Sequence, residues 1–201
     1  EAEAMRVIDT IVWQIRLPRV ALAALVGAAL GLAGAGFQGV FRNPLADPYL
    51  LGAASGAGFA ASLAIVSGGA FGLGMLGVPV AAFVGAAATV ALVVALARRG
   101  WSLPIVPLVL AGVVVGSCLA AGTSFVLLAA REQAAGVLTW LLGSLAFASW
   151  SRVGTLLPPV LLAAAVLIAA ARSLDVLQLG ERAAAQLGLR VEGLKLTVVA
   201  A

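Results

Sequence analysis

Long runs of apolar residues, separated by short polar connections, occupy most of the chain. Five runs are complete and a sixth begins near the end of the sequence; they lie near 20–41, 48–67, 76–97, 104–130 and 153–172, and from 193 onward. Apolar runs of about 18 residues or more predict membrane spans. The runs are continuously aliphatic rather than alternating, which predicts helices and not barrel strands. The expected fold is an all-α, polytopic membrane helical bundle with about five complete transmembrane helices and the start of a sixth.

Prolines and short polar residues mark the corners of this pattern. Two X-Pro pairs break the chain in the segment 42–52, where Asn43 and Asp47 can cap local backbone N–H groups and Asp47 can cap the second span. Pro158 and Pro159 lie inside the fifth run, so we expect that helix to bend or to begin later than its hydropathy suggests. Glycines spaced four residues apart predict close helix packing; the pairs are Gly27/Gly31, Gly52/Gly56 and Gly112/Gly116.

The composition excludes most other classes of protein. Hydrophobic residues make up 63% of the chain and charged residues 10%, against roughly 25% charged in soluble proteins. A soluble enzyme, a coiled coil, a collagen and a disordered chain are therefore excluded. The sequence has no histidine, and Cys118 is its single cysteine, so imidazole metal sites, His-based triads and internal disulfides are impossible. We predict no catalytic residue, no metal site and no cofactor.

The positive charges carry information about topology. If the spans alternate, one set of connections holds Arg42, Arg98, Arg99, Arg172, Arg182, Arg190 and Lys195, and the other holds Arg6, Arg16, Arg19, Arg131 and Arg152. The larger set favours the cytoplasmic side, which leaves positive charge before the first span on the outside. The charges form no basic stripe, so we expect no binding to nucleic acid.

The segment 174–190 differs from the spans because it predicts a short amphipathic helix at 180–189, on the cytoplasmic side. Gly180 precedes the helix and Gly188 provides a stop. Leu179, Ala183 and Leu187 fall on one face, with Arg182 and Gln186 on another. Such a helix either lies on lipid or docks on a soluble partner. Its polar face lacks a cluster of lysine and arginine, which weakens the lipid alternative.

Several motifs together resemble the FecCD permease family, the membrane subunits of bacterial ABC importers for iron–siderophore complexes, haem and vitamin B12. The motifs are RLPR at 16–19, GAGFQG at 34–39, RNPLADP at 42–48 and LQLGERA at 177–183. Members of this family have about ten membrane helices. By this resemblance, residues 1–201 form a single transmembrane permease domain that is truncated at both ends. The resemblance also implies a multi-pass protein of the bacterial cytoplasmic (inner) membrane.

The resemblance also implies roles for particular residues. The helix at 180–189 would be the coupling helix, which docks on a cytoplasmic ATPase subunit through Gly180, Glu181, Arg182, Ala183, Gln186, Leu187 and Gly188. Arg16 and Arg19 would meet acidic residues of a periplasmic or extracellular substrate-binding protein. The helix at 104–130 would line a passage shared with a second permease subunit, as in a homodimer, with Ser117, Thr123 and Ser124 as its polar residues. The segment 134–150 resembles the external segment that follows this helix in the family.

These implications make the chain a transport subunit and not an enzyme, since ATP hydrolysis would take place in the separate ATPase. Two alternatives remain open at the level of sequence. The first is a secondary transporter or channel that works without ATP; the near absence of ionisable residues within the spans counts against ion coupling. The second is a truncated fragment without function of its own.

Overall fold

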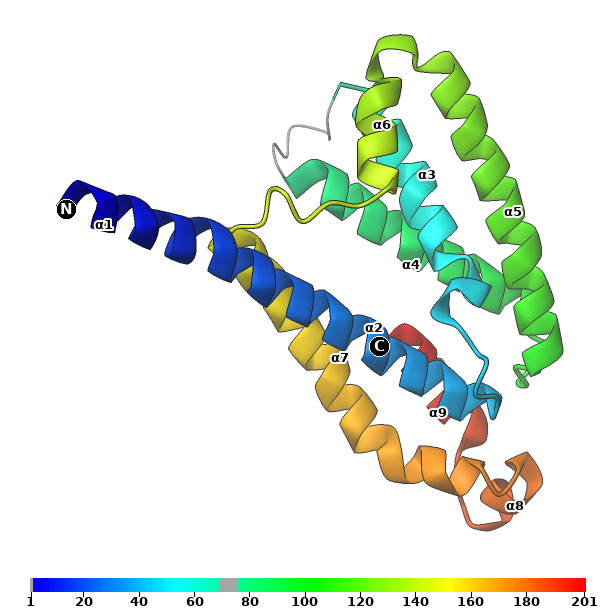
Figure 1. Ribbon diagram of the computed structural model, residues 1–201. Coiled ribbons are helices and arrows are strands. Elements are labelled where there is room, and N and C mark those ends of the chain that lie inside the picture. The colour runs from blue at the N-terminus through cyan, green and yellow to red at the C-terminus, as the bar shows by residue number, and fades with distance from the viewer. Residues whose placement is uncertain (1, 69–75) are drawn as a thin grey trace. The chain divides into compact units, whose positions relative to one another are not determined.

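Helices form the regular elements of the computed structural model, which describes residues 2–68 and 76–201 (Figure 1). The α-helices are α1 (Ala2–Thr10), α2 (Leu17–Phe41), α3 (Ala53–Val66), α4 (Gly77–Ala97), α5 (Ile105–Ala129), α6 (Ala134–Leu141), α7 (Trp150–Leu177), α8 (Glu181–Gln186) and α9 (Val191–Ala200). A π-helix, η1 (Ile11–Arg16), joins α1 to α2, and short 3-10 helices, η2 (Pro48–Leu51) and η5 (Arg131–Gln133), precede α3 and α6. The predicted all-α class is confirmed.

The helix that contains α2 is longer than the first apolar run. Among the described residues, four helices are long and apolar enough to cross a membrane, and the first of them runs from Met5 to Phe41 without interruption. It includes the π-helical turn Ile11–Arg16 and Pro18. The other three are α4, α5 and α7.

The second predicted span is divided into two shorter pieces. Asp47 Oδ1 accepts a hydrogen bond from the Tyr49 N–H at 2.7 Å, so Asp47 caps η2 and does not cap the long helix as expected. Gly52, with φ 71°, turns the chain and stands at the N-cap of α3. At about 1.5 Å per residue, the 14 residues of α3 extend roughly 21 Å, less than the roughly 30 Å of a bilayer core.

The helix α7 begins earlier than expected, not later. Ser149 Oγ accepts a hydrogen bond from the Arg152 N–H at 3.3 Å and so caps the helix just before Trp150. Pro158 and Pro159 then lie inside a continuous helix of 28 residues. The expected later start is therefore wrong, because the serine cap upstream of the prolines sets the beginning of the helix.

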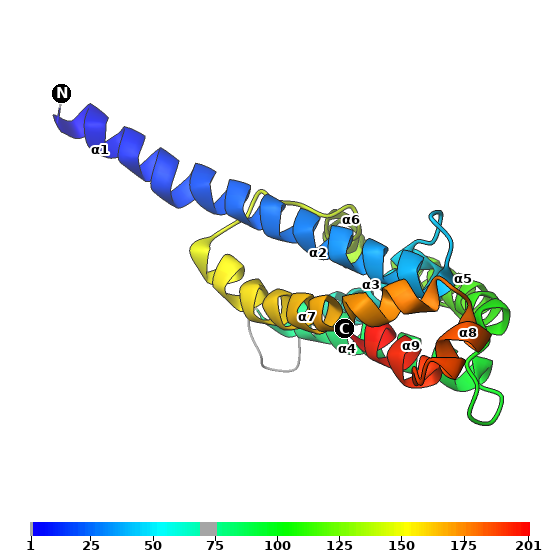
Figure 2. The ribbon, with the colours of Figure 1, turned by 90° about the horizontal axis from the view of Figure 1, so that it is seen from below.

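Contacts divide the chain into two compact units, one formed by the chain up to Ala46 with Ser144–Ala201, and the other by Asp47–Gly143. In the first unit α2 and α7 lie side by side with α9 against both (Figure 2). A Cβ at Gly36 of α2 would lie 3.1 Å from both Leu167 of α7 and Val198 of α9, so this glycine lets the three helices meet.

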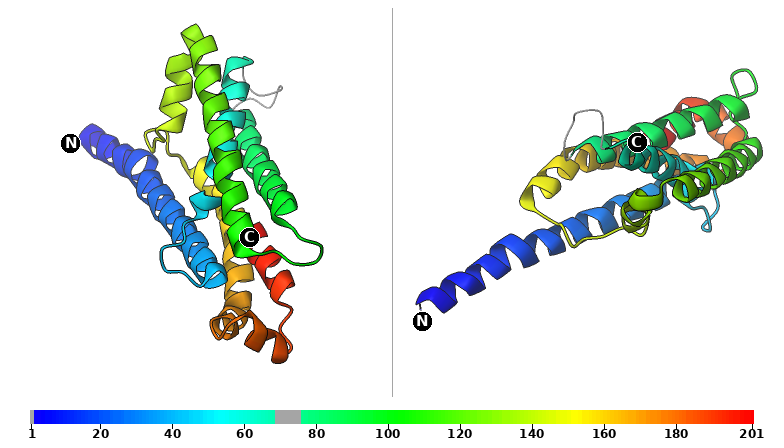
Figure 3. Two further views of the ribbon diagram at one scale, coloured as in Figure 1. Left: turned by 90° about the vertical axis from the view of Figure 1, so that its right-hand side faces the viewer. Right: turned by 90° about the horizontal axis from the view of Figure 1, so that it is seen from above.

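In the second unit, α3 packs against α4, α5 and α6 (Figure 3). Gly56 of α3 and Gly85 of α4 face each other so closely that a Cβ on either would collide with the other's backbone. Gly112 of α5 likewise lies against the backbone of Leu50, and a Cβ at Gly116 would lie 3.4 Å from Gly52 Cα. Close packing is thus confirmed for two of the three predicted glycine pairs. At Gly27 and Gly31, a Cβ would meet no atom of the described residues within 4 Å.

We predict that Gly56→Ala destabilises the protein by about 1–3 kcal/mol, the usual cost of overpacking, because the added methyl would overlap Gly85 and the side chain of Thr89. Gly136→Ala in α6 is the matched control, since its Cβ would lie 3.7 Å from Ile65 in ordinary contact. Thermal unfolding of the purified protein in detergent measures both. Equal unfolding temperatures for the two variants would contradict the close α3–α4 contact.

Candidate functional site

The short helix α8 follows α7 and is delimited by glycines on both sides. Gly180 is its N-cap, with φ 107° and ψ 151°, a region that side chains other than glycine rarely enter. At the other end, the N–H groups of Gly188 and Leu189 donate to the carbonyls of Ala185 and Ala184, each at 3.0 Å. This is a Schellman motif with Gly188 at φ 85°. The helix therefore comprises Glu181–Gln186 and is shorter than the predicted 180–189.

The buried side of α8 is a single alanine. Ala184 is fully buried in a cluster with Leu177 and Val191, surrounded by Leu174, Val176, Leu189 and Leu194. Of the predicted apolar face, Ala183 lies in α8, whereas Leu179 and Leu187 flank the helix and are each 68% exposed. The predicted stripe at i, i+4 and i+8 is therefore wrong in its geometry, because a helix of six residues is too short to carry it.

Polar contacts attach the turn between α7 and α8 to the end of α2. The Gln178 side-chain amide donates to the carbonyl of Gly39 at 2.9 Å and to that of Leu174 at 3.4 Å. Arg42, the left-handed C-cap of α2, brings its guanidinium Nη1 to 3.6 Å from the position of a Cβ on Gly180. The ends of α2 and α7 consequently lie together.

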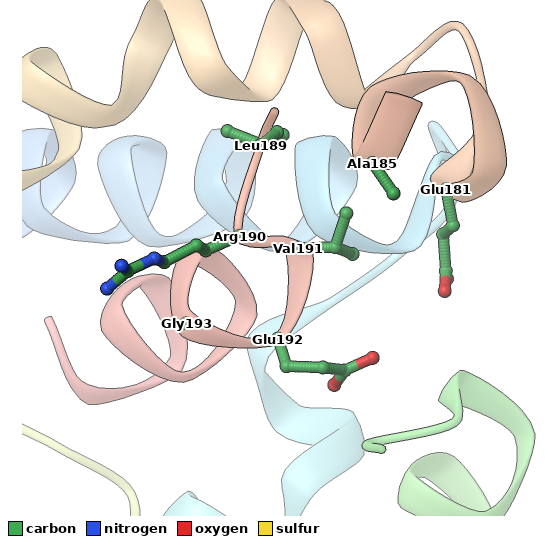
Figure 4. Close-up of a pocket in the computed structure, with 7 residues that line it drawn as sticks. All are labelled: Glu181, Ala185, Leu189, Arg190, Val191, Glu192 and Gly193. Atoms are coloured by element: carbon green, nitrogen blue, oxygen red, sulfur yellow. The ribbon is translucent and has the colours of Figure 1, made fainter. Parts of the chain in front are cut away.

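A buried lysine, which the sequence analysis did not single out as a site residue, attaches α8 to α9. Lys195 is 1% exposed, and its Nζ lies 3.0 Å from Glu181 Oε1 and 3.3 Å from Glu192 Oε1. Figure 4 shows both carboxylates beside a pocket of about 380 Å³ between α8 and the start of α9. The sequence signal was a lone lysine in an apolar stretch, three residues after a glutamate.

The outer side of α8 is open. Arg182, Gln186 and Leu187 are exposed, as is Leu179 just before the helix, while Ala183 and Glu181 are partly buried. We call Leu179, Arg182, Gln186 and Leu187 the α8 surface. It combines two exposed leucines with a cationic and an amide side chain, a mixture suited to docking on another protein.

The predicted docking arginines lie at the opposite end of the same unit. Arg16 and Arg19 are both exposed, and Arg19 Nη2 donates to the carbonyl of Ala146 at 3.4 Å. At this end the Trp150 indole N–H also donates to the carbonyl of Trp13 at 2.9 Å. Because Trp150 bonds Trp13 near the beginnings of the two helices and Gln178 bonds Gly39 near their ends, α2 and α7 run parallel.

The polar residues of α5 divide into two groups. Ser117 and Ser124 are exposed, and the Ser124 hydroxyl donates to the Ala120 carbonyl at 3.1 Å. Thr123 is buried, and its hydroxyl donates to the Leu119 carbonyl at 2.9 Å. Within the described ranges 2–68 and 76–201, no three His, Cys, Asp or Glu side chains gather as metal ligands would.

The profile of the FecCD transport family matches residues 2–201, and the chain belongs to that family. It is 40% identical to the cobalamin import system permease protein BtuC of Halobacterium salinarum, over 96% of this chain and 51% of that protein. It is 37% identical to the hemin transport system permease protein HmuU of Yersinia pestis, over 94% of this chain and 57% of that protein. The chain thus spans about half the length of the curated relatives it matches.

A solved structure shares the fold. It is an ABC transporter assigned to the metal-chelate type, in an inward-facing conformation; the TM-score is 0.89 and the identity 30%, over 97% of this chain and 61% of that one. With four apolar helices of spanning length and permease relatives, the chain is a multi-pass membrane protein.

We predict that Gly180→Ala loosens α8 at a cost of about 1–3 kcal/mol, because an alanine does not tolerate the backbone angles found there. Amide hydrogen exchange in 181–189 should become faster. Gly193→Ala is the control, since Gly193 is helical and its Cβ would lie 3.8 Å from Arg190 Cβ. Unchanged exchange in the Gly180 variant would argue against the assigned N-cap.

Proposed function

We propose that this chain is the permease part of a binding-protein-dependent ABC importer that moves an iron–siderophore complex, haem or cobalamin across the cytoplasmic membrane of a bacterium. One observation carries the proposal: α8 is a short helix with an exposed outer surface, packed on its inner side against α7 and α9, and the turn before it is bonded to the end of α2. The functions for which the relatives are named, cobalamin and hemin import among them, support the class of cargo.

In this proposal the chain makes and breaks no bonds. A separate cytoplasmic subunit hydrolyses ATP, and α8 docks on it through Gly180, Glu181, Arg182, Ala183, Gln186, Leu187 and Gly188. Two permease subunits, as a homodimer, enclose the passage. Closure of the ATPase pair displaces α8, and the helices attached to it tilt as rigid bodies, so that the inner and outer gates alternate.

The packing around α8 suits such a lever. Its underside is an apolar cluster around Ala184, the turn before it is bonded by Gln178 to α2, and Glu181 in its first turn is paired with α9. Several independent contacts restrict relative motion more than a single contact would. A force applied to the α8 surface therefore reaches membrane helices with little loss in local bending.

At the outer end, Arg16 and Arg19 dock the substrate-binding protein through its acidic residues. Exposed ion pairs contribute only about 0.2–1 kcal/mol each, so the arginines set the orientation and rate of docking more than its affinity. The contact between Arg19 and the Ala146 carbonyl supports a second task for this residue, which is to hold the segment before α7 in place.

Along α5, exposed Ser117 and Ser124 suit the wall of a passage better than buried Thr123. Thr123 uses its hydroxyl within its own helix and faces neighbouring side chains. We therefore place the serines on the passage and assign Thr123 to helix packing.

We predict that Leu187→Asp, in the full-length protein, weakens binding of the ATPase subunit about tenfold or more, because a charge would enter the apolar part of the interface. Leu187→Met keeps the apolar volume and should bind as the parent does. Co-purification of the ATPase and titration of its binding in detergent measure the effect. Wild-type binding by the aspartate variant would refute docking through the α8 surface.

We also predict that Arg16→Glu combined with Arg19→Glu slows association of the binding protein, and that the defect grows as salt is lowered, since screening then weakens. Arg6→Glu, at an exposed position of α1, is the control for a change of charge elsewhere on the same continuous helix. Association rates over a series of salt concentrations provide the measurement. A defect independent of salt would contradict an electrostatic role.

A further inference from the structure

We propose that Lys195 is a positioning residue that fastens α8 to α9, so that α8 and the start of α9 move as one body. This inference rests on the proposed function, because it concerns how a displacement of α8 reaches the membrane helices. It assigns to α9 a direct share in that movement, in addition to α7, which precedes α8 in the chain.

The two ion pairs of Lys195 have different consequences. Glu192 stands three residues before Lys195 in α9, so the bond between them lies within one helix and orients the lysine. Glu181 stands in the first turn of α8, so the 3.0 Å contact from its Oε1 to Lys195 Nζ crosses between helices. The difference between an intrahelical and an interhelical partner makes the site testable.

Burial makes the interhelical bond directional and persistent. The Lys195 side chain is 2% exposed, whereas those of Glu181 and Glu192 are 38% and 34% exposed. A buried ammonium is costly without a partner, so it holds its carboxylates, while each carboxylate can turn to water if the lysine is lost. The apolar cluster of Ala184, Leu177 and Val191 lacks such directionality, because apolar contacts tolerate sliding. The ion pair therefore sets the register between α8 and α9.

The experiment uses the full-length protein, assembled in lipid nanodiscs with its proposed ATPase subunit, and measures stimulation of ATP hydrolysis by the proposed binding protein. The signal must cross the membrane helices to reach the ATPase, so the fold-stimulation reports coupling without knowledge of the cargo. Glu181→Gln removes the interhelical charge and Glu192→Gln the intrahelical one, with the same chemistry and with Lys195 retained. Lys195→Met removes the ion pairs with both glutamates and keeps most of the side-chain volume.

We expect Lys195→Met and Glu181→Gln to lower the fold-stimulation about threefold to thirtyfold, the range of mutations that alter coupling between sites. Glu192→Gln should stay near the parent. Lys195→Met should keep the bound ATPase and its basal hydrolysis. The double variant of Glu181 and Lys195 should lose no more than either single variant, because both remove the same bond.

Parent-like stimulation in Lys195→Met would overturn the inference, as would equal losses in the two glutamine variants. Loss of the bound ATPase in Lys195→Met would also overturn it, since Lys195 would then serve docking rather than transmission. If Lys195→Met does not fold, the two glutamine variants decide, with the bound ATPase also measured for Glu181→Gln because Glu181 belongs to the proposed docking residues. Loss of the bound ATPase in Glu181→Gln would then overturn the inference. A parent protein that binds no ATPase would instead refute the proposed function, so the two failures are distinguishable.

Discussion

Satisfaction of backbone hydrogen bonds in the absence of water is the constraint on which this structure depends. In lipid an unpaired N–H or C=O group is too costly to expose, so each apolar run must be helical. At the exposed corners the chain still pairs the backbone groups that its helix ends leave open. The chain does so with a few side chains and glycines: Asn43 and Asp47 bond the backbone after α2, Ser149 caps α7, and Gly188 closes α8 in a Schellman motif. The positions of these residues, more than hydropathy, decide where each helix begins and ends.

Helices of similar hydrophobicity then need a second device to associate, because lipid solvates their side chains as well as a neighbouring helix would. Glycines supply this second device, because they have no side chain to keep two helix backbones apart. At Gly56 and Gly85 the backbones of α3 and α4 approach so closely that no Cβ fits, and Gly36 admits Leu167 and Val198 between α2, α7 and α9. The sequence indicated which glycines follow a packing spacing, yet it could not indicate their partners. Gly27 and Gly31 have the same spacing and meet no described neighbour within 4 Å, so spacing alone does not establish a contact.

The apolar runs predicted the helices well, since length and hydropathy suffice to find a membrane helix. Boundaries were less predictable because they depend on local caps: Asp47 starts η2 instead of α3, and Ser149 starts α7 ahead of Pro158 and Pro159. The glycines that flank α8 were found from the sequence, but its buried residue was not. Ala184 is the buried residue because it packs against Leu177 and Val191, which lie outside α8. From the sequence, Lys195 served only as one of the positive charges that indicate the orientation of the spans. Its pairing with Glu181 joins separate helices, and sequence spacing carries no information on such a contact.

The distribution of charge also bears on what drives transport in the proposed function. The apolar spans of this chain carry almost no ionisable group, which counts against proton or sodium coupling through them. Charged residues lie instead at helix ends, and Lys195, one turn into an apolar helix, is neutralised by two carboxylates rather than left facing lipid. In the proposed function, the attached α8 at one end and the arginines before α2 at the other are the polar surfaces on which partners act, and the helices between them carry the response across the membrane.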